Sequence, residues 1–363
     1  MKEFFAQQKK IISHYLDEFL SAKSEVLNDV HSMGGDSTAR ILDFAEKGKM
    51  LRGGLVALAY FLIAGEETPK ETEEYPLSPR AVSAVGGAME LFQSAFLIHD
   101  DIMDRDEKRR GSRSVFSQYV SLAESHKFRD SYHTGEALGI CVGDIAFFLA
   151  FEILAEVARS TGNTQLTALC SKELSYVGVA QMLDVYWGQD QSTITEKEVF
   201  DLYRYKTGRY TFSLPLLSGG YLGGASQKQR DDLERIGELL GIVFQLKDDE
   251  LGLFGDEEQL GKPIGSDISE GKKTLFYVAL MERAGPEEKE KLSKLFGKSD
   301  VSGDEVEYVR RVSLRYDIRT WVLDICRRYA DEARELIEGM EGVKAPYQRI
   351  LIDLLDYSLE RTS

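Results

Sequence analysis

The 363-residue sequence is poor in the residues that build disulfide frameworks and transition-metal centres. Its three cysteines lie in separate apolar segments without CxxC spacing, which argues against a disulfide scaffold or a zinc site. We expect Cys141, Cys170 and Cys326 to be reduced thiols in the core of a cytoplasmic protein. None of the five histidines belongs to a Glu-x-x-His pair, which excludes a di-iron carboxylate bundle.

Long apolar runs and an excess of basic charge are also missing. No stretch of 18 consecutive apolar residues occurs, and the N-terminus is amphipathic rather than a signal peptide. The formal net charge of −16 argues against nucleic acids and anionic membranes as partners, because both require a broad basic surface. We therefore expect a soluble protein without stable membrane insertion. Any anionic ligand would need metal ions and local lysine or arginine residues.

Strand patterns and internal repeats are absent as well, and helical periodicity dominates. Apolar residues recur at spacings of three and four over most of the chain. The segments are 2–30, 36–47, 49–65, 78–105, 136–160, 163–190, 195–217, 226–254, 271–283, 303–313, 316–340 and 346–361. With 43% hydrophobic residues and no linker, this predicts an all-α fold. We expect one helical bundle domain over residues 1–363 with a central substrate cavity.

Local breaks in the pattern give further expectations. Pro215 lies inside a helical segment, so we expect it to kink that helix or to begin one after Thr211. The mid-helix pair Thr207-Gly208 also indicates a kink. The acidic stretches 66–77 and 286–305 predict solvated surface loops.

An aspartate cluster, Asp100-Asp101-Ile-Met-Asp104, ends one long apolar segment. Residues four apart share a helix face, so Asp100 and Asp104 would present two carboxylates together. Mg²⁺ binds in this way, through one or two carboxylates plus substrate phosphates. Arg109 and Arg110 follow, and guanidinium groups suit phosphate oxygens. This first aspartate cluster therefore predicts a site for a diphosphate.

A second aspartate cluster, Asp248-Asp249, ends another apolar segment and is followed by a glycine-rich stretch with Lys262. Glycine there would allow tight turns and close backbone approach. No GxxxxGK[ST] motif is present, so this is not a P-loop. If the two helices pack side by side, the two clusters would hold one diphosphate between them.

Two further segments carry cations. Lys49 and Arg52 lie where an apolar helix begins, and a helix N-terminus favours anions. Lys206 precedes the Thr207-Gly208 pair. Each alone is compatible with an ordinary surface cation. The four elements together favour a diphosphate site.

From about residue 45 to residue 280 the chain resembles the trans-isoprenyl diphosphate synthases, the polyprenyl synthetase family. The motifs that carry this resemblance are GKxLR at 48–52, LIHDDxxD…RRG at 97–111, KTG at 206–208 and FQxKDD…GKPxGSD at 244–267. The resemblance implies a homodimeric, Mg²⁺-dependent prenyltransferase that condenses isopentenyl diphosphate with an allylic diphosphate.

The resemblance also implies roles for individual residues. Three Mg²⁺ ions would be bound by Asp100, Asp101, Asp104, Asp248 and Asp249. The allylic diphosphate would be held by Arg109, Lys206 and Lys262, and isopentenyl diphosphate by Lys49, Arg52, Gln93 and Arg110. Thr207 and Gln245 would line the reacting centre. The catalytic set would comprise Asp100, Asp104, Lys206, Thr207, Gln245 and Asp248.

Two positions depart from the family pattern. Gly252 stands where many members have the last aspartate of the second motif, so we expect weaker metal binding there. Gln93 replaces a histidine of many members and cannot become cationic, so the affinity for isopentenyl diphosphate would be lower. We interpret His99 as a helix-end residue rather than a base, because it directly precedes the first aspartate cluster.

Product length should depend on the helix that leads to Asp100. Five residues before it stands the small Ala95, and four before it the bulky Phe96. By resemblance, aromatic residues at these two positions shorten the product. We expect Phe92 and Met89 to form the floor and the product to be geranylgeranyl diphosphate (C20), with farnesyl diphosphate (C15) as the main alternative.

Two other functions remain open. A class I terpene cyclase or head-to-head synthase would share the carboxylate chemistry, but would not need Lys49, Arg52 and Arg110. A non-catalytic subunit of a prenyl synthase would be expected to lose the first aspartate cluster, which is intact.

Overall fold

The computed structural model describes residues 1–65, 79–189, 194–255 and 265–361. These residues are helical almost throughout, so the all-α prediction is confirmed. The described ranges contain one sheet, a short antiparallel ribbon of β1 (Lys108–Arg109) and β2 (Ser112–Arg113). The chain divides into two compact units, Met1–Ala168 with Pro215–Ala225, and Leu169–Leu214 with Ser226–Ser363.

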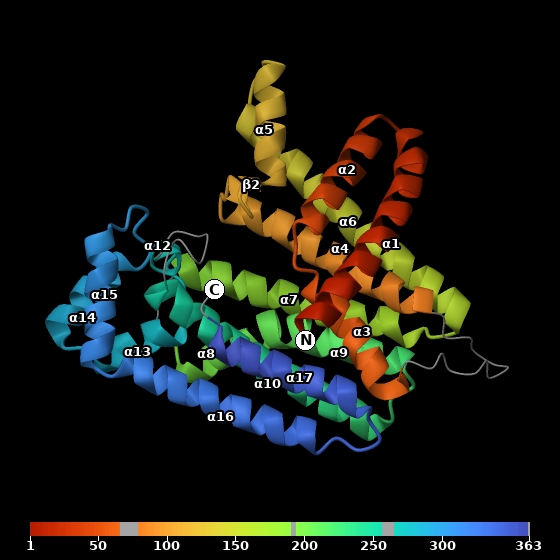
Figure 1. The fold of residues 1–363 in the computed structure, drawn as a ribbon. Coiled ribbons are helices and arrows are strands. Elements are labelled where there is room, and N and C mark those ends of the chain that lie inside the picture. Colours follow the sequence, from red (N-terminus) through yellow and green to blue (C-terminus); the bar gives the residue numbers. More distant parts are fainter. Residues whose placement is uncertain (66–78, 190–193, 256–264, 362–363) are drawn as a thin grey trace. The chain divides into compact units, whose positions relative to one another are not determined.

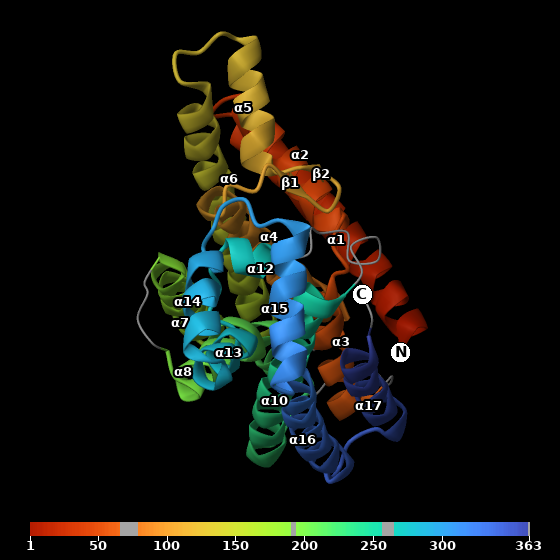
Figure 2. The same cartoon turned by 90° about the vertical axis from the view of Figure 1, so that its left-hand side faces the viewer.

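The first unit is built around two long apolar helices that pack against each other, α4 and α6 (Figure 1). Its helices are α1 (Lys2–Asn28), α2 (Met33–Glu46), α3 (Leu51–Ala64), α4 (Pro79–Met103), α5 (Val115–Ser125), α6 (Ser131–Thr161) and α9 (Leu214–Leu222). The helix α3 contacts α4 closely, because a Cβ on Gly53 would lie only 3.0 Å from the carbonyl oxygen of Gly86. Figure 2 shows α5 beside the first turns of α6.

The second unit is built around α10, which packs against η1, α16 and α17. The helices α10, α16 and α17 are labelled in Figure 1. Its elements are most of α7 (Gln165–Gln189), α8 (Glu196–Leu202), η1 (Tyr203–Ser213), α10 (Gln227–Phe254), α12 (Ser266–Ser269), α13 (Leu275–Arg283), α14 (Pro286–Leu295), α15 (Gly303–Arg315), α16 (Ile318–Glu338) and α17 (Ala345–Glu360). A capping box at Ser226, with Gln229 as its second member, begins α10.

The element η1 is a π-helix, a form that often occurs at functional sites. It contains Thr207 and Gly208, where the sequence predicted a kink, and α9 begins directly after it with Pro215 as its second residue. The wide turn of η1 approaches α10 closely, because a Cβ on Gly208 would meet the carbonyl oxygen of Glu238 at 3.1 Å.

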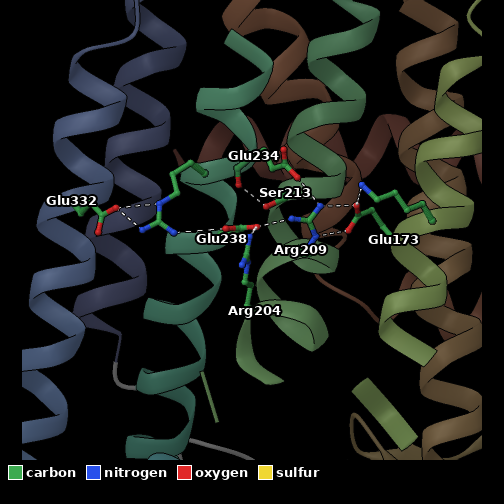
Figure 3. A network of polar contacts seen from close by, with 9 residues as sticks. Glu173, Arg204, Arg209, Ser213, Glu234, Glu238 and Glu332 are labelled. Carbon is green, nitrogen blue, oxygen red and sulfur yellow. Dashed lines mark hydrogen bonds and ion pairs between the residues drawn. The ribbon is translucent and has the colours of Figure 1, made fainter. Parts of the chain in front are cut away.

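A buried ion-pair network fixes η1 to its neighbours (Figure 3). The Arg209 guanidinium donates to Glu173 of α7 at 2.8 Å, and to Glu234 and Glu238 of α10 at 2.6 Å each. Arg204 pairs with Glu238 as well, at 2.8 Å. Removing one partner of such a network would leave uncompensated buried charge, which is strongly destabilising.

Three sequence expectations are corrected. The stretch 286–305 is not simply a loop, because α14 covers Pro286–Leu295 and buries Leu292 and Leu295 among charged neighbours. The helix α5 had no counterpart among the expected segments. Cys141 is exposed rather than a core thiol, whereas Cys170 and Cys326 are buried and all three are free. The stretch 66–77 lies outside the described residues.

Two described helices are long and apolar enough to cross a membrane, Arg80–Met103 and Ser131–Thr161. In their most apolar windows, 78% and 44% of the residues are buried inside the protein. Core helices of soluble proteins have the same length and composition, so two such helices are weak evidence for membrane insertion. The absence of membrane insertion stays a prediction.

Candidate functional site

The first aspartate cluster lies at the C-terminal end of α4. The backbone N–H of Asp104 donates to the carbonyl oxygen of Asp100 at 2.8 Å, so the helical turn continues past Met103. Asp100 and Asp104 are therefore one turn apart, as predicted. Asp101 is buried, and its Oδ2 atom has no hydrogen-bond partner within the described residues. A buried carboxylate oxygen of this kind is suited to binding a cation.

The hairpin of β1 and β2 places the guanidinium of Arg109 beside these carboxylates. Its two loop residues, Arg110 and Gly111, both have positive φ, as a type I′ hairpin turn requires. Arg109 Nε donates to Asp101 Oδ1 at 2.5 Å, and Arg109 Nη2 lies 3.6 Å from Asp100 Oδ2. Burial raises the pKa of Asp101 to about 6, and the charge of Arg109 opposes this shift.

The guanidinium of Arg110 has different partners from that of Arg109. Its Nη1 donates to the carbonyl oxygen of Phe44 at 3.0 Å, and its guanidinium lies 5.4 Å from the Phe44 ring centroid. A Cβ on Gly48 would lie 2.9 Å from the same Nη1 atom, so the glycine of the GKxLR motif makes room for it. Burial lowers the pKa of Arg110, and the carboxyl group of Glu90 opposes this effect.

Glu90 is a functional candidate that the motifs did not indicate. It is buried in α4 and accepts a hydrogen bond from the backbone N–H of Gly53 at 2.8 Å, so it caps the first turn of α3. Burial raises its pKa, opposed by this N–H and by Arg52 and Arg110. Gln93 lies three residues further along α4 and is half-buried, and Lys49 is exposed. The sequence signal that could have identified Glu90 is its position as a single acidic residue within a long apolar segment.

The expected chain-length residues form an aromatic cluster with α6. Met89, Phe92 and Ala95 are fully buried, and Phe96 is half-buried. The ring of Phe92 lies 5.0 Å from that of Phe151, and the ring of Phe96 lies 4.9 Å from that of Phe147. Sequence reasoning missed these two α6 residues, although Phe147 and Phe151 are four apart and share a helix face.

His99 is held against the same helix. Its Nε2 atom lies 3.1 Å from the carbonyl oxygen of Ile140 and 3.6 Å from Asp144 Oδ1. These contacts involve the backbone and a side chain of α6, and the role of His99 as a helix-end residue rather than a base stays a prediction.

In the second unit, the two adjacent aspartates face different surroundings. The side chain of Asp248 is 55% exposed and pairs with Arg361 of the C-terminal segment at 2.9 Å. Asp249 is buried, and its Oδ1 and Oδ2 atoms accept hydrogen bonds from Gln245 and Tyr203. Burial raises the pKa of Asp249 to about 8, with a further contribution from the charge of Asp267.

The space that an aspartate side chain at position 252 would occupy is partly filled by another carboxylate. A Cβ on Gly252 would lie 2.9 Å from Asp267 Oδ2, so Asp267 occupies the space where a side chain at position 252 would begin. A small cavity of about 20 Å³ is lined by Gly252, Asp249 and Asp267, which is room for one water molecule. Lys262 lies outside the described residues.

Lys206 on η1 forms an ion pair with Asp184 of α7. Sequence reasoning missed Asp184, although it is the only charged residue between Glu173 and the end of α7. Beside Lys206, the hydroxyl of Thr207 donates to Gln245 Oε1 at 2.8 Å, so the two residues expected at the reacting centre are in contact.

Within the described ranges, no three His, Cys, Asp or Glu side chains converge as a complete metal site. The first cluster nevertheless fits Mg²⁺, because this ion takes one or two carboxylates and completes its shell with water and substrate phosphates.

The model of the polyprenyl synthetase family matches residues 39–312, which is most of the chain. The chain belongs to this family. A short chain isoprenyl diphosphate synthase of Methanothermobacter thermautotrophicus is 30% identical over 86% of both chains. A geranylgeranyl diphosphate synthase of Saccharolobus solfataricus is 29% identical over 88% of both.

Solved structures agree with this membership. A geranylgeranyl pyrophosphate synthase of Corynebacterium glutamicum, crystallised with isoprenyl diphosphate and magnesium, aligns with 98% of this chain and 99% of its own. The sequence identity is 27% and the TM-score is 0.86. The protein is therefore a prenyltransferase of the short-chain isoprenyl diphosphate synthase type.

Proposed function

We propose that this prenyltransferase condenses isopentenyl diphosphate with dimethylallyl, geranyl or farnesyl diphosphate and releases C20 geranylgeranyl diphosphate. The small, buried Ala95 five residues before Asp100 carries the proposal of this length. A side chain this small would leave the first turn beyond the aspartates open to a prenyl chain. Phe92, packed on Phe151, would close the path about 12 Å from Asp100, at a rise of 1.5 Å per residue.

The allylic diphosphate would be bound through Mg²⁺ by the carboxylates of both aspartate clusters, in one domain over residues 1–363. The family match over 39–312 includes parts of both units and supports this assignment. Three Mg²⁺ ions would be held by Asp100, Asp101, Asp104, Asp248 and Asp249. Bound there, Mg²⁺ would neutralise the charge that develops on the departing diphosphate.

The protein's own cations would hold the same diphosphate. Arg109 already lies against the first cluster, and binding of a diphosphate would give its guanidinium a further anionic partner. Lys206 would exchange its ion pair with Asp184 for a phosphate oxygen. Lys262 would complete the set.

Isopentenyl diphosphate would bind where α3 begins, at Lys49, Arg52, Gln93 and Arg110. Glu90 supports this assignment, because its carboxyl caps α3 and faces both Arg52 and Arg110. At the reacting centre, Thr207 and Gln245 would contact the allylic carbons. Apolar residues of α4 and α6 would exclude water from the carbocation.

A C15 product is the second candidate, and Phe96 is the observation that favours it. The ring of Phe96 lies four residues before Asp100 and packs edge-to-face on Phe147, so it could narrow the path above Phe92. The two candidates differ in which ring stops the growing chain.

Chain-length analysis of the products separates the candidates. The purified protein is incubated with Mg²⁺, isopentenyl diphosphate and each allylic starter, and we expect mainly C20 product. Phe92→Ala should shift most of the product to C25 or longer, because it removes the floor. Unchanged lengths in this variant would eliminate Phe92 as the floor, and no elongation with any starter would refute the proposed activity.

We further propose that the protein is a cytoplasmic homodimer. Exposed apolar side chains support an interface in each unit: Phe148 of α6 is 71% exposed and Met182 of α7 is 72% exposed. Val179, Val185 and Tyr186 extend the exposed face of α7. Sedimentation equilibrium should give twice the chain mass, and a single-chain mass at micromolar concentration would exclude the dimer.

A further inference from the structure

Arg209 connects η1 to two neighbouring helices at once. Its guanidinium is buried and donates four hydrogen bonds to three glutamates. Two of these bonds, at 2.8 Å each, form a bidentate pair with Glu173 of α7. The other two reach Glu234 and Glu238 of α10, and Figure 3 shows the guanidinium between the α7 and α10 glutamates. We call these four residues the arginine clamp.

On α7, the clamp and the partner of Lys206 lie on one side of the helix. Glu173 and Asp184 are 11 residues apart, which is about three turns, so their side chains leave α7 in similar directions. Asp184 forms the ion pair with Lys206, and Lys206 precedes Arg209 by three residues. Two charged pairs therefore join η1 to the same side of α7. A rotation of η1 about its axis that breaks one pair would also displace the other.

The backbone contact between η1 and α10 does not by itself prevent such a rotation. A Cβ on Gly241 would overlap the Cα atom of Gly208, so the two backbones touch at this point. Two glycines in contact have no side chains that interlock, although interlocking side chains normally set the angle between packed helices. Directional hydrogen bonds have to set it instead, and the planar guanidinium of Arg209 donates four of them.

The π-helical form of η1 also requires support from its neighbours. It covers Tyr203–Ser213 and therefore contains both Lys206 and Arg209. Runs of π-helix are rare, so contacts with other helices are needed to hold one of this length. A change from i→i+5 to i→i+4 hydrogen bonds would rotate Lys206 relative to α7. The clamp opposes this change because it fixes a residue inside η1 to α7 and α10 together.

We propose that Arg209 is a positioning residue for the allylic diphosphate: by binding glutamates of α7 and α10 it fixes the rotation of η1 and thereby places the Lys206 ammonium for the diphosphate. This inference rests on the proposed function, in which Lys206 holds the allylic diphosphate. The guanidinium of Arg209 is already bound by three carboxylates, so it acts through Lys206 and not on the substrate.

The test is Arg209→Lys, which keeps the positive charge but replaces the planar fork by a single ammonium group. Attraction of the diphosphate by net charge is thus unchanged, and only the orientation of η1 is lost. We expect the KM for geranyl diphosphate to rise about tenfold, because the charged hydrogen bond from Lys206 is weakened. The KM for isopentenyl diphosphate should stay within about twofold, because the residues proposed to bind it belong to the first unit.

The difference between the two KM values separates positioning from a loss of folded protein. A partly unfolded sample contains fewer active molecules, which lowers the apparent kcat and leaves both KM values unchanged. Arg235→Lys is the control within the same network, because Arg235 joins α10 to Glu332 of α16 at 2.5 Å. It should change either KM by less than about twofold. An unchanged KM for geranyl diphosphate in Arg209→Lys, or an equal rise in Arg235→Lys, would overturn the proposal.

A double-mutant cycle with Lys206→Ala shows whether Arg209 acts through Lys206. Once the ammonium group is gone, Arg209→Lys should raise the KM for geranyl diphosphate by less than about twofold further. Effects of the two substitutions that multiply would mean that Arg209 acts by another route, and would contradict the proposal.

A second variant keeps the test decisive if Arg209→Lys does not fold. Glu173→Gln retains the shape of the side chain but can accept only one of the two hydrogen bonds of the bidentate pair. We expect about a threefold rise in the KM for geranyl diphosphate alone, and no rise would refute the clamp. A wild-type protein that elongates no starter refutes the proposed function instead.

Discussion

Both aspartate clusters end a long apolar helix, but their buried carboxyl groups have different partners. In each pair one aspartate points into the protein, Asp101 or Asp249, and its neighbour is more exposed, because consecutive helix residues point about 100° apart. Asp101 is paired with the guanidinium of Arg109. Asp249 is bound by two neutral donors, Tyr203 and Gln245.

This difference in partners explains why the pKa of Asp249 is higher than that of Asp101. Burial raises the pKa of both carboxyl groups, but a neighbouring cation favours the ionised form, and a neighbouring carboxylate opposes it. The pKa of Asp101 accordingly rises to about 6, whereas that of Asp249, near Asp267, rises to about 8. The first cluster places its buried carboxyl group beside a cation, whereas the second places its buried carboxyl group near another carboxyl group.

The largest expected effect on kcat/KM distinguishes Asp100 from Asp248, the more exposed members of the two clusters. We expect Asp100→Ala to lower kcat/KM by at least about 10³-fold, because it removes half of the carboxylate pair at the end of α4. Asp248→Ala should cost about 10- to 100-fold, since Asp248 is the more solvated residue and pairs with Arg361. Steady-state kinetics over a range of Mg²⁺ concentrations measures both.

The control for this comparison is Asp231→Ala, an exposed carboxylate on α10 that should change kcat/KM by less than about twofold. Equal losses for Asp100→Ala and Asp248→Ala would show that the clusters contribute equally. Full activity of Asp100→Ala would refute the metal assignment.

A smaller effect should come from restoring the missing carboxylate of the second cluster. Gly252→Asp places a new side chain 2.9 Å from Asp267 Oδ2, so we expect kcat/KM to fall about tenfold through crowding and repulsion between like charges. Adding Asp267→Ala should return activity to within about threefold of wild type. Asp267→Ala alone should reduce activity, and no loss in this variant would mean that Asp267 does not replace the absent aspartate.

The smallest effect concerns stability and pH in the presence of EDTA. An Asp249 whose pKa is raised from 3.8 to about 8 keeps its proton in the folded state at pH values where the unfolded chain has lost it. Its stabilising contribution is therefore present below about pH 4 and is lost as the pH rises to about 8. Asp249→Asn cannot ionise, so the Tm of this variant relative to wild type should rise by about 5 °C across that window. A constant difference, measured by calorimetry, would contradict the raised pKa of Asp249.

Sequence periodicity predicted most of the helices, because an amphipathic helix needs only a local pattern of apolar residues. It failed at α14, where charged residues hide the spacing of Leu292 and Leu295, and at the short helix α5. The motifs similarly predicted Asp100 and Asp104 on one face, since four residues make about one turn whatever the rest of the fold does.

Partners from distant segments could not be predicted in this way. Glu90 capping α3, Phe151 against Phe92, and Asp184 on Lys206 each join residues from different helices. The sequence by itself determined which helices form and which carboxylates and cations they carry, because those properties depend on neighbouring residues. Only the tertiary structure decided which carboxyl group receives a guanidinium and which receives a phenol and an amide, because packing brings those donors together.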